Sequence, residues 1–113
     1  MPKSREILEK TQVQGIEESR SWIMLTSDID VNGDYLTPAS VTSVKAYSYN
    51  KHTGAYTDVT ATVMPAGVAV ITDRYISLPP LTALTEGVFY RIECKYVTGG
   101  NTLEKYMWVQ AER

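Results

Sequence analysis

Acidic and amide side chains alternate along residues 28–34, which makes this segment the most distinctive chemical motif in the chain. The motif consists of Asp28, Asp30, Asn32 and Asp34. Calcium is bound by several oxygen ligands, and this spacing around Gly33 is similar to the opening of a helix-flanked calcium loop. Such a loop ends in a bidentate glutamate at its twelfth position, where this chain has Ala39. We therefore predict a surface loop whose side chains bond their own backbone. A calcium site at these four residues is the alternative, and no other metal or cofactor is expected.

The remaining residues with chemical potential lack the partners that catalysis requires. His52 is the only histidine, and no Cys, Asp or Glu lies near it at metal-ligand spacing, so we expect a solvated loop residue. Cys94 stands in the middle of an alternating segment, which predicts a small buried hydrophobe. Glu17 and Glu18 are neighbours on a predicted strand, so they would point to opposite faces and not converge on one bond. With no nucleophile elbow, phosphate loop or zinc spacing, we predict no catalytic residues and no enzyme.

Aromatic residues suggest a different kind of site. The chain has eight tyrosines, two tryptophans and one phenylalanine. Six aromatic residues in predicted strands are the candidates for such a site, namely Tyr47, Tyr49, Tyr56, Tyr75, Tyr106 and Trp108. Gathered on one exposed sheet face, they would stack on sugar rings or anchor a protein interface. In a sandwich, however, some must fill the core and others cover the sheet, and this is the interpretation we favour.

Length and composition limit the class of protein. The 113 residues fit one domain over 1–113, with residues 1–5 as a flexible lead. The net charge of −2 comes without a Lys/Arg block, so nucleic-acid binding is not expected. The apolar stretches are too short to span a membrane. A single cysteine rules out an internal disulfide, and the first residues lack the apolar run of a signal peptide, so we expect synthesis in the cytoplasm.

Short alternating segments predict an all-β fold. The predicted strands span residues 6–13, 16–25, 41–49, 56–64, 68–71, 75–78, 88–97 and 102–110. The clearest is 88–97, where Tyr90, Ile92, Cys94 and Tyr96 alternate with charged residues. Turn signals recur every 8–12 residues, and no long helix is expected. This pattern predicts an immunoglobulin-like antiparallel β-sandwich of about seven or eight strands.

Two further features favour the immunoglobulin-like arrangement. Tyr90 follows a leucine- and glycine-containing connection at 81–87, which resembles the tyrosine corner of such domains. Trp22, on an early strand, would fill the space between the sheets from the other side. On the strand at 41–49, alternation places Val41, Ser43 and Lys45 on one face.

Several segments together carry a family resemblance. They are REILEK at 5–10, GIEE at 15–18, GVFYRI at 87–92, TGG at 98–100 and EKYMWV at 104–109. In strand pattern and turn placement the chain resembles the small stand-alone immunoglobulin-like proteins encoded in tailed-phage structural clusters and in prophages, such as fibre–tail adaptor proteins. It departs from them in the opening segment, which has Lys10-Thr11-Gln12 where those proteins often have Lys-x-Pro.

This resemblance implies a non-enzymatic structural or adhesion module of a virion. Its expected partners are other virion proteins or copies of itself, and its expected location is the bacterial cytoplasm during synthesis and the virion after assembly. We expect sheet edges and residues 4–13 to make these contacts, because an exposed edge strand can pair with another chain. The alternative is a carbohydrate-binding sandwich that uses exposed Tyr and Trp rings.

Overall fold

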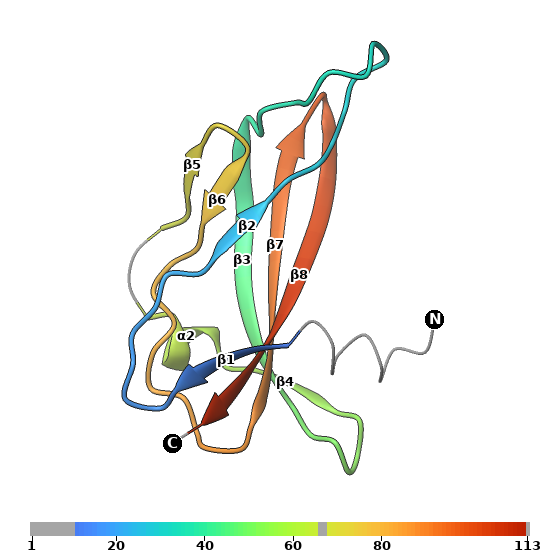
Figure 1. Cartoon of the computed structure of the whole chain (residues 1–113). Helices are drawn as coiled ribbons and strands as arrows, with labels where there is room; N and C mark the ends of the chain where they lie inside the picture. Colours follow the sequence, from blue (N-terminus) through green and yellow to red (C-terminus); the bar gives the residue numbers. More distant parts are fainter. Residues whose placement is uncertain (1–10, 66–67, 113) are drawn as a thin grey trace.

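The computed structural model describes residues 11–65 and 68–112, which fold into two β-sheets packed against each other (Figure 1). The strands are β1 (Gln12–Gly15), β2 (Ile23–Leu25), β3 (Ser40–Tyr49), β4 (Tyr56–Asp58), β5 (Val70–Thr72), β6 (Tyr75–Ser77), β7 (Phe89–Thr98) and β8 (Asn101–Glu112). The larger sheet has the order β1-β8-β7-β3-β4, and the smaller has the order β2-β6-β5. The predicted all-β class is confirmed. Within the described residues the only helix is α2 (Thr60–Val63), a single turn.

The hairpin of β7 and β8 forms the centre of the larger sheet. Gly99 and Gly100 lie between the two strands with φ angles of 54° and 80°. Two consecutive positive φ angles in a two-residue loop are typical of a type I′ turn, whose twist matches that of the flanking strands. The turn predicted at residues 98–101 is therefore confirmed.

The core lies between the two sheets, and the alternation of β7 positions it as predicted. Ile92 and Cys94 have no exposed surface, and Tyr90 and Tyr96 are also buried. Ile76 of β6, also fully buried, belongs to the same core cluster. The smaller sheet is built of three-residue strands and covers only part of the larger one (Figure 1).

A β-bulge in β3 overturns the predicted facing of its first residues. Val41 pairs with Tyr96 while Ser43 pairs with Lys95, so Thr42 is the extra residue between them. An inserted residue reverses the facing of every side chain before it. Val41 therefore packs against the core, and the prediction that it shares a face with Ser43 and Lys45 was wrong.

The first strand departs from the antiparallel prediction, because β1 pairs in parallel with β8. Of the strand predicted at 6–13, residues 6–10 lie outside the described part of the chain, as does the lead at 1–5. The strand predicted at 16–25 was largely wrong, since only β2 forms. A tight turn ends β1: the Gly15 N–H donates to the Glu18 carboxylate at 2.6 Å, and the Glu18 N–H donates to the Gly15 carbonyl at 3.0 Å.

The strand predicted at 56–64 was also partly wrong, because it stops at Asp58 and α2 follows. The Asp58 carboxylate accepts hydrogen bonds from the N–H and the hydroxyl of Thr60, at 3.0 and 2.7 Å. These bonds lower the pKa of the Asp58 carboxyl below its usual value. A side chain that satisfies backbone N–H groups locally favours a helical turn over continued strand.

Tyr90 and Trp22 lie close to where the sequence placed them. The Tyr90 hydroxyl accepts a hydrogen bond from the Thr85 N–H at 2.8 Å, which ties the preceding connection to β7. Trp22 packs against the core, but it is only half-buried and precedes β2. Among the described residues, no helix is long and apolar enough to cross a membrane.

Candidate binding surfaces

The segment with the calcium-like motif forms a protruding loop between β2 and β3, which we call the finger (residues 28–36). Asp30 organises it: its Oδ1 accepts hydrogen bonds from the N–H groups of Asn32 and Asp34, at 2.8 and 3.1 Å. Asp28 instead accepts a hydrogen bond from the Tyr96 hydroxyl at 2.8 Å. Across the described residues, no three His, Cys, Asp or Glu side chains are placed to hold a metal ion. Asp28 and Asp30 thus stabilise the finger and its base.

The other residues singled out for chemistry are scattered. His52 is exposed in the loop between β3 and β4. Its backbone N–H donates to the Asn50 side-chain oxygen at 2.9 Å. Glu17 and Glu18 lie in the region after β1 and not on a strand, so the predicted reason for their separation was wrong. The Glu18 carboxylate is used by the Gly15 N–H.

Cys94 is buried in the core, and burial raises the pKa of its thiol to about 11 from 9.0. Burial, together with the hydrogen bond to Asp28, also raises the pKa of the Tyr96 hydroxyl to about 12 from 10.0. Neither group is poised to act as a nucleophile near neutral pH, because the deprotonated form is disfavoured.

These two buried groups predict a loss of stability in alkali. In the unfolded chain each group releases its proton at a lower pH than in the folded chain. The free energy of unfolding therefore keeps the full contribution of both groups below about pH 9, and it falls as the pH rises toward 11 to 12. Each group contributes a slope of up to about 1.4 kcal/mol per pH unit within its window. Urea unfolding at several pH values between 8 and 11 measures this slope, which should be shallower in Cys94→Ala. An unchanged slope in that variant contradicts the assignment to Cys94.

Five of the six aromatic residues considered as binding candidates lie together on the outer surface of the larger sheet, which we call the aromatic face. They are Tyr47, Tyr49, Tyr56, Tyr106 and Trp108. Pairing explains the gathering, because Tyr47, Arg91 and Trp108 are cross-strand partners on the side opposite the core. Tyr75 lies on the smaller sheet instead.

Ring contacts make part of the aromatic face a small second core. The Tyr49 ring centroid lies 5.0 Å from that of Tyr56 and 5.5 Å from that of Trp108. Trp108 is only 6% exposed, whereas Tyr56 and Tyr106 are 47% and 43% exposed. The Arg91 guanidinium lies 4.1 Å from the Tyr106 ring centroid. Two rings are therefore open to a ligand, and the tryptophan is not.

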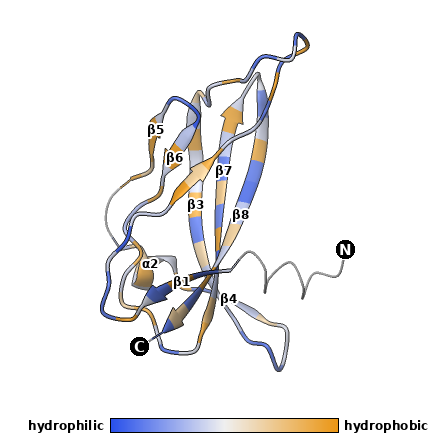
Figure 2. Cartoon of the chain, in the orientation of Figure 1, coloured by the Kyte–Doolittle hydropathy of each residue, from blue (hydrophilic) through white to orange (hydrophobic). Residues whose placement is uncertain are grey.

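The outer surface of the smaller sheet is apolar, and we call it the apolar face. It consists of Ile23, Leu25, Val70 and Tyr75, with exposed fractions of 60%, 41%, 53% and 46%. Ser77 of β6 lies between Ile23 and Val70, and Tyr75 pairs with Leu25, so these side chains are neighbours. β2 and β5 are coloured hydrophobic over most of their length in Figure 2.

The apolar face was not predicted from the sequence, although a signal was present. Residues 22–25 are apolar at every position instead of alternating. Met24 enters the core while Ile23 and Leu25 face outward. A fully apolar strand at the surface of a sandwich is a pattern typical of an interaction surface.

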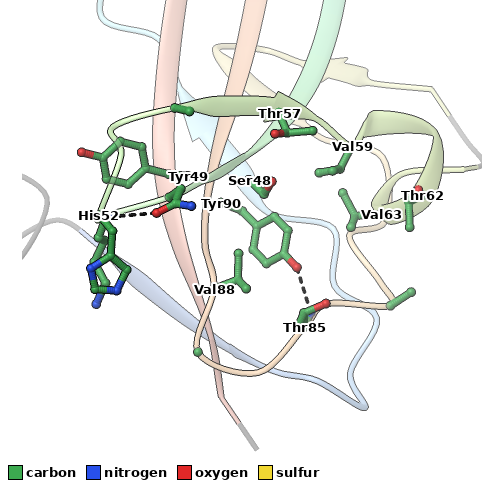
Figure 3. A pocket seen from close by; sticks show the side chains of 15 residues that line it. Ser48, Tyr49, His52, Thr57, Val59, Thr62, Val63, Thr85, Val88 and Tyr90 are labelled. Atoms are coloured by element: carbon green, nitrogen blue, oxygen red, sulfur yellow. Dashed lines mark hydrogen bonds between the residues drawn. The ribbon is translucent and has the colours of Figure 1, made fainter.

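A hollow lies beside the β3–β4 hairpin (Figure 3). This hairpin is at the end of the molecule opposite the finger (Figure 1). The volume of the hollow is about 500 Å³, which falls in the range of ordinary binding pockets. Hydroxyl groups of Ser48, Thr57, Thr62 and Thr85 line it. Val63, Val88 and the Tyr90 ring provide apolar surface, and Lys51 and His52 come from the hairpin loop.

Comparison with known proteins identifies no relative. No protein-family model, curated protein or solved structure matches the chain. The surfaces of the molecule are therefore the only guide to its function.

Proposed function

We propose that the sandwich is of the immunoglobulin type. In that fold, strands C, F and G form one sheet with C′ added beside C, and strands B, E and D form part of the other. The orders β8-β7-β3-β4 and β2-β6-β5 agree with that plan. The hydrogen bond between Tyr90 and Thr85 is further support, because it corresponds to the tyrosine corner.

We propose that the chain is a non-enzymatic structural module of a phage or prophage virion, which acts through protein–protein contacts. The observation that carries this proposal is the apolar face, because three large aliphatic side chains and a tyrosine lie exposed together on one sheet. Monomeric proteins rarely leave such a contiguous apolar surface in water unless it binds something. A flat sheet surface suits another protein surface better than a small molecule, which is normally bound in a concave site.

The apolar face can be tested by following the protein into particles. Leu25→Lys places a charge within the apolar face without touching the core, since Leu25 points outward from β2. We expect the amount of this variant in purified particles to fall at least tenfold relative to the wild type, when each is supplied to a phage that lacks its own copy. The matched control is Thr102→Lys at an exposed position of β8, which should be incorporated normally. Equal incorporation of the two variants would exclude the apolar face as the contact surface.

A carbohydrate-binding module is the second candidate, and the aromatic face favours it. Tyr56 and Tyr106 expose their rings on one sheet surface, and Arg91 lies between them with centroid distances of 5.7 and 4.1 Å. Glu93 is 2.9 Å from the Arg91 Nε. Exposed rings beside charged groups are able to stack on sugars and to bond their hydroxyls. A glycan array that shows binding by the wild type, and none by Tyr106→Ala, would establish this function.

A further inference from the structure

The finger presents apolar side chains to solvent on a well-supported base. Val31 at its tip is fully exposed, and Ile29 and Tyr35 are 57% and 60% exposed. An antiparallel bridge between Ile29 and Tyr35 closes the loop. At the base, the Arg74 guanidinium stacks 3.7 Å from the Tyr35 ring centroid. A preorganised loop with an exposed apolar tip loses little conformational freedom when it binds.

The charges of the finger and of the hollow are opposite. Residues 28–36 contain three aspartates and no lysine or arginine. Among the residues that line the hollow, Lys51 is cationic and none is acidic. Complementary charge steers two surfaces together and fixes their orientation.

The position of these two features suits contact between copies of the chain. The finger extends beyond one end of the strands, and the β3–β4 hairpin beside the hollow lies at the other end (Figure 1). The finger of a chain is therefore remote from its own hollow, but it is free to reach the hollow of the next chain. The apolar floor beside Val88 and Tyr90 would receive Val31. The Lys51 ammonium, which lies 4.8 Å from the Phe89 ring centroid in the single chain, would turn toward the Asp34 carboxylate of the second copy.

We infer that the hollow binds the finger of a second copy, so that the chains associate head to tail. This inference extends the proposed structural role by naming one partner, but it uses surfaces separate from the apolar face. A head-to-tail contact uses a different patch on each chain, and it builds a ring or a filament according to the rotation between copies.

Sedimentation velocity with two single variants tests the inference. Val31→Lys damages only the finger, and Lys51→Glu damages only the hollow; both positions are exposed. The wild type should show a sedimentation coefficient that rises with concentration. Each variant alone should associate at least tenfold more weakly. An equimolar mixture should form a one-to-one dimer and nothing larger, because Lys51→Glu still has an intact finger and Val31→Lys an intact hollow.

Other outcomes overturn the inference. A wild type that stays monomeric at the highest attainable concentration excludes it. A mixture that fails to dimerise excludes a head-to-tail contact, and association that survives in Lys51→Glu alone indicates a contact that does not use the hollow. The double variant Asp34→Lys with Lys51→Glu should associate again, because the two charges are exchanged.

A further variant separates this inference from the proposed function. Leu25→Lys lies outside both the finger and the hollow, so it should leave head-to-tail association unchanged. Loss of association in that variant would assign self-assembly to the apolar face instead.

Discussion

Replacing Gln14 with leucine should lower the free energy of unfolding by about 2–4 kcal/mol, which is a large effect for a polar side chain. Gln14 is fully buried on β1. Its amide nitrogen donates to the carbonyls of Leu81 and Glu18, at 2.6 and 3.2 Å, and its oxygen accepts from the Trp22 indole at 2.8 Å. Leucine has a similar volume but forms none of these bonds. The Trp22 indole N–H and the Glu18 carbonyl lose this partner, whereas the Leu81 carbonyl keeps its hydrogen bond from the Arg20 N–H at 3.1 Å. Each buried group left unpaired costs about 1–3 kcal/mol.

Urea unfolding of Gln14→Leu and of a matched control measures this contribution. Gln12 lies two residues earlier on the same strand and is exposed, so Gln12→Leu should change stability by no more than about 0.5 kcal/mol. If the two variants were equally stable, the Gln14 bonds would contribute nothing to joining β1, Trp22 and the connection at Leu81.

The second large effect is expected at Trp108, where alanine should cost about 3–5 kcal/mol of stability. Trp108 faces away from the space between the sheets, yet it is 6% exposed because Tyr49 and Tyr56 pack around it. Removal of a buried indole loses its burial and leaves a cavity. Thermal unfolding should show a clear decrease in melting temperature.

Tyr106→Ala is the control for Trp108→Ala and also distinguishes structural from binding roles. Tyr106 is 43% exposed, so its loss should cost no more than about 1 kcal/mol. If both variants were destabilised to the same small extent, Trp108 would not be packed as described. Glycan binding that disappears in the stable Tyr106→Ala variant would identify this ring as part of a sugar site.

Local sequence pattern predicted the parts of the fold that depend on one strand and its turn. The alternation of Ile92 and Cys94 with charged residues placed them correctly in the core. Gly99 and Gly100 marked the turn that pairs β7 with β8, because few other residues adopt two successive positive φ angles.

Features that depend on distant or irregular contacts were not predictable in this way. The bulge at Thr42 leaves no signature in the alternation, although it reverses the facing of Val41. The helical turn after Asp58 depends on its side-chain bonds to Thr60, which a β-rich composition conceals. The partner of Gln14 at Leu81 is 67 residues away, so nothing near Gln14 in the sequence indicates its burial.

The candidate surfaces, like the fold, were predicted from the sequence only in part. The aromatic residues were identified, but strand pairing was needed to show that five of them share one face while Tyr75 does not. The loop at 28–34 was located correctly, and the structure adds that Asp30 supports the loop itself. The hollow joins Lys51, Thr62 and Thr85 from three separate connections, and it emerges only once the chain is folded.

The most direct test of the structural role is a count of this chain in purified phage particles, by mass spectrometry against an isotope-labelled standard. A structural module should be present in a fixed number of copies per particle, which stays constant between preparations and through a density gradient. Its absence from particles, while the folded protein is abundant in the same lysate, would contradict the proposed function.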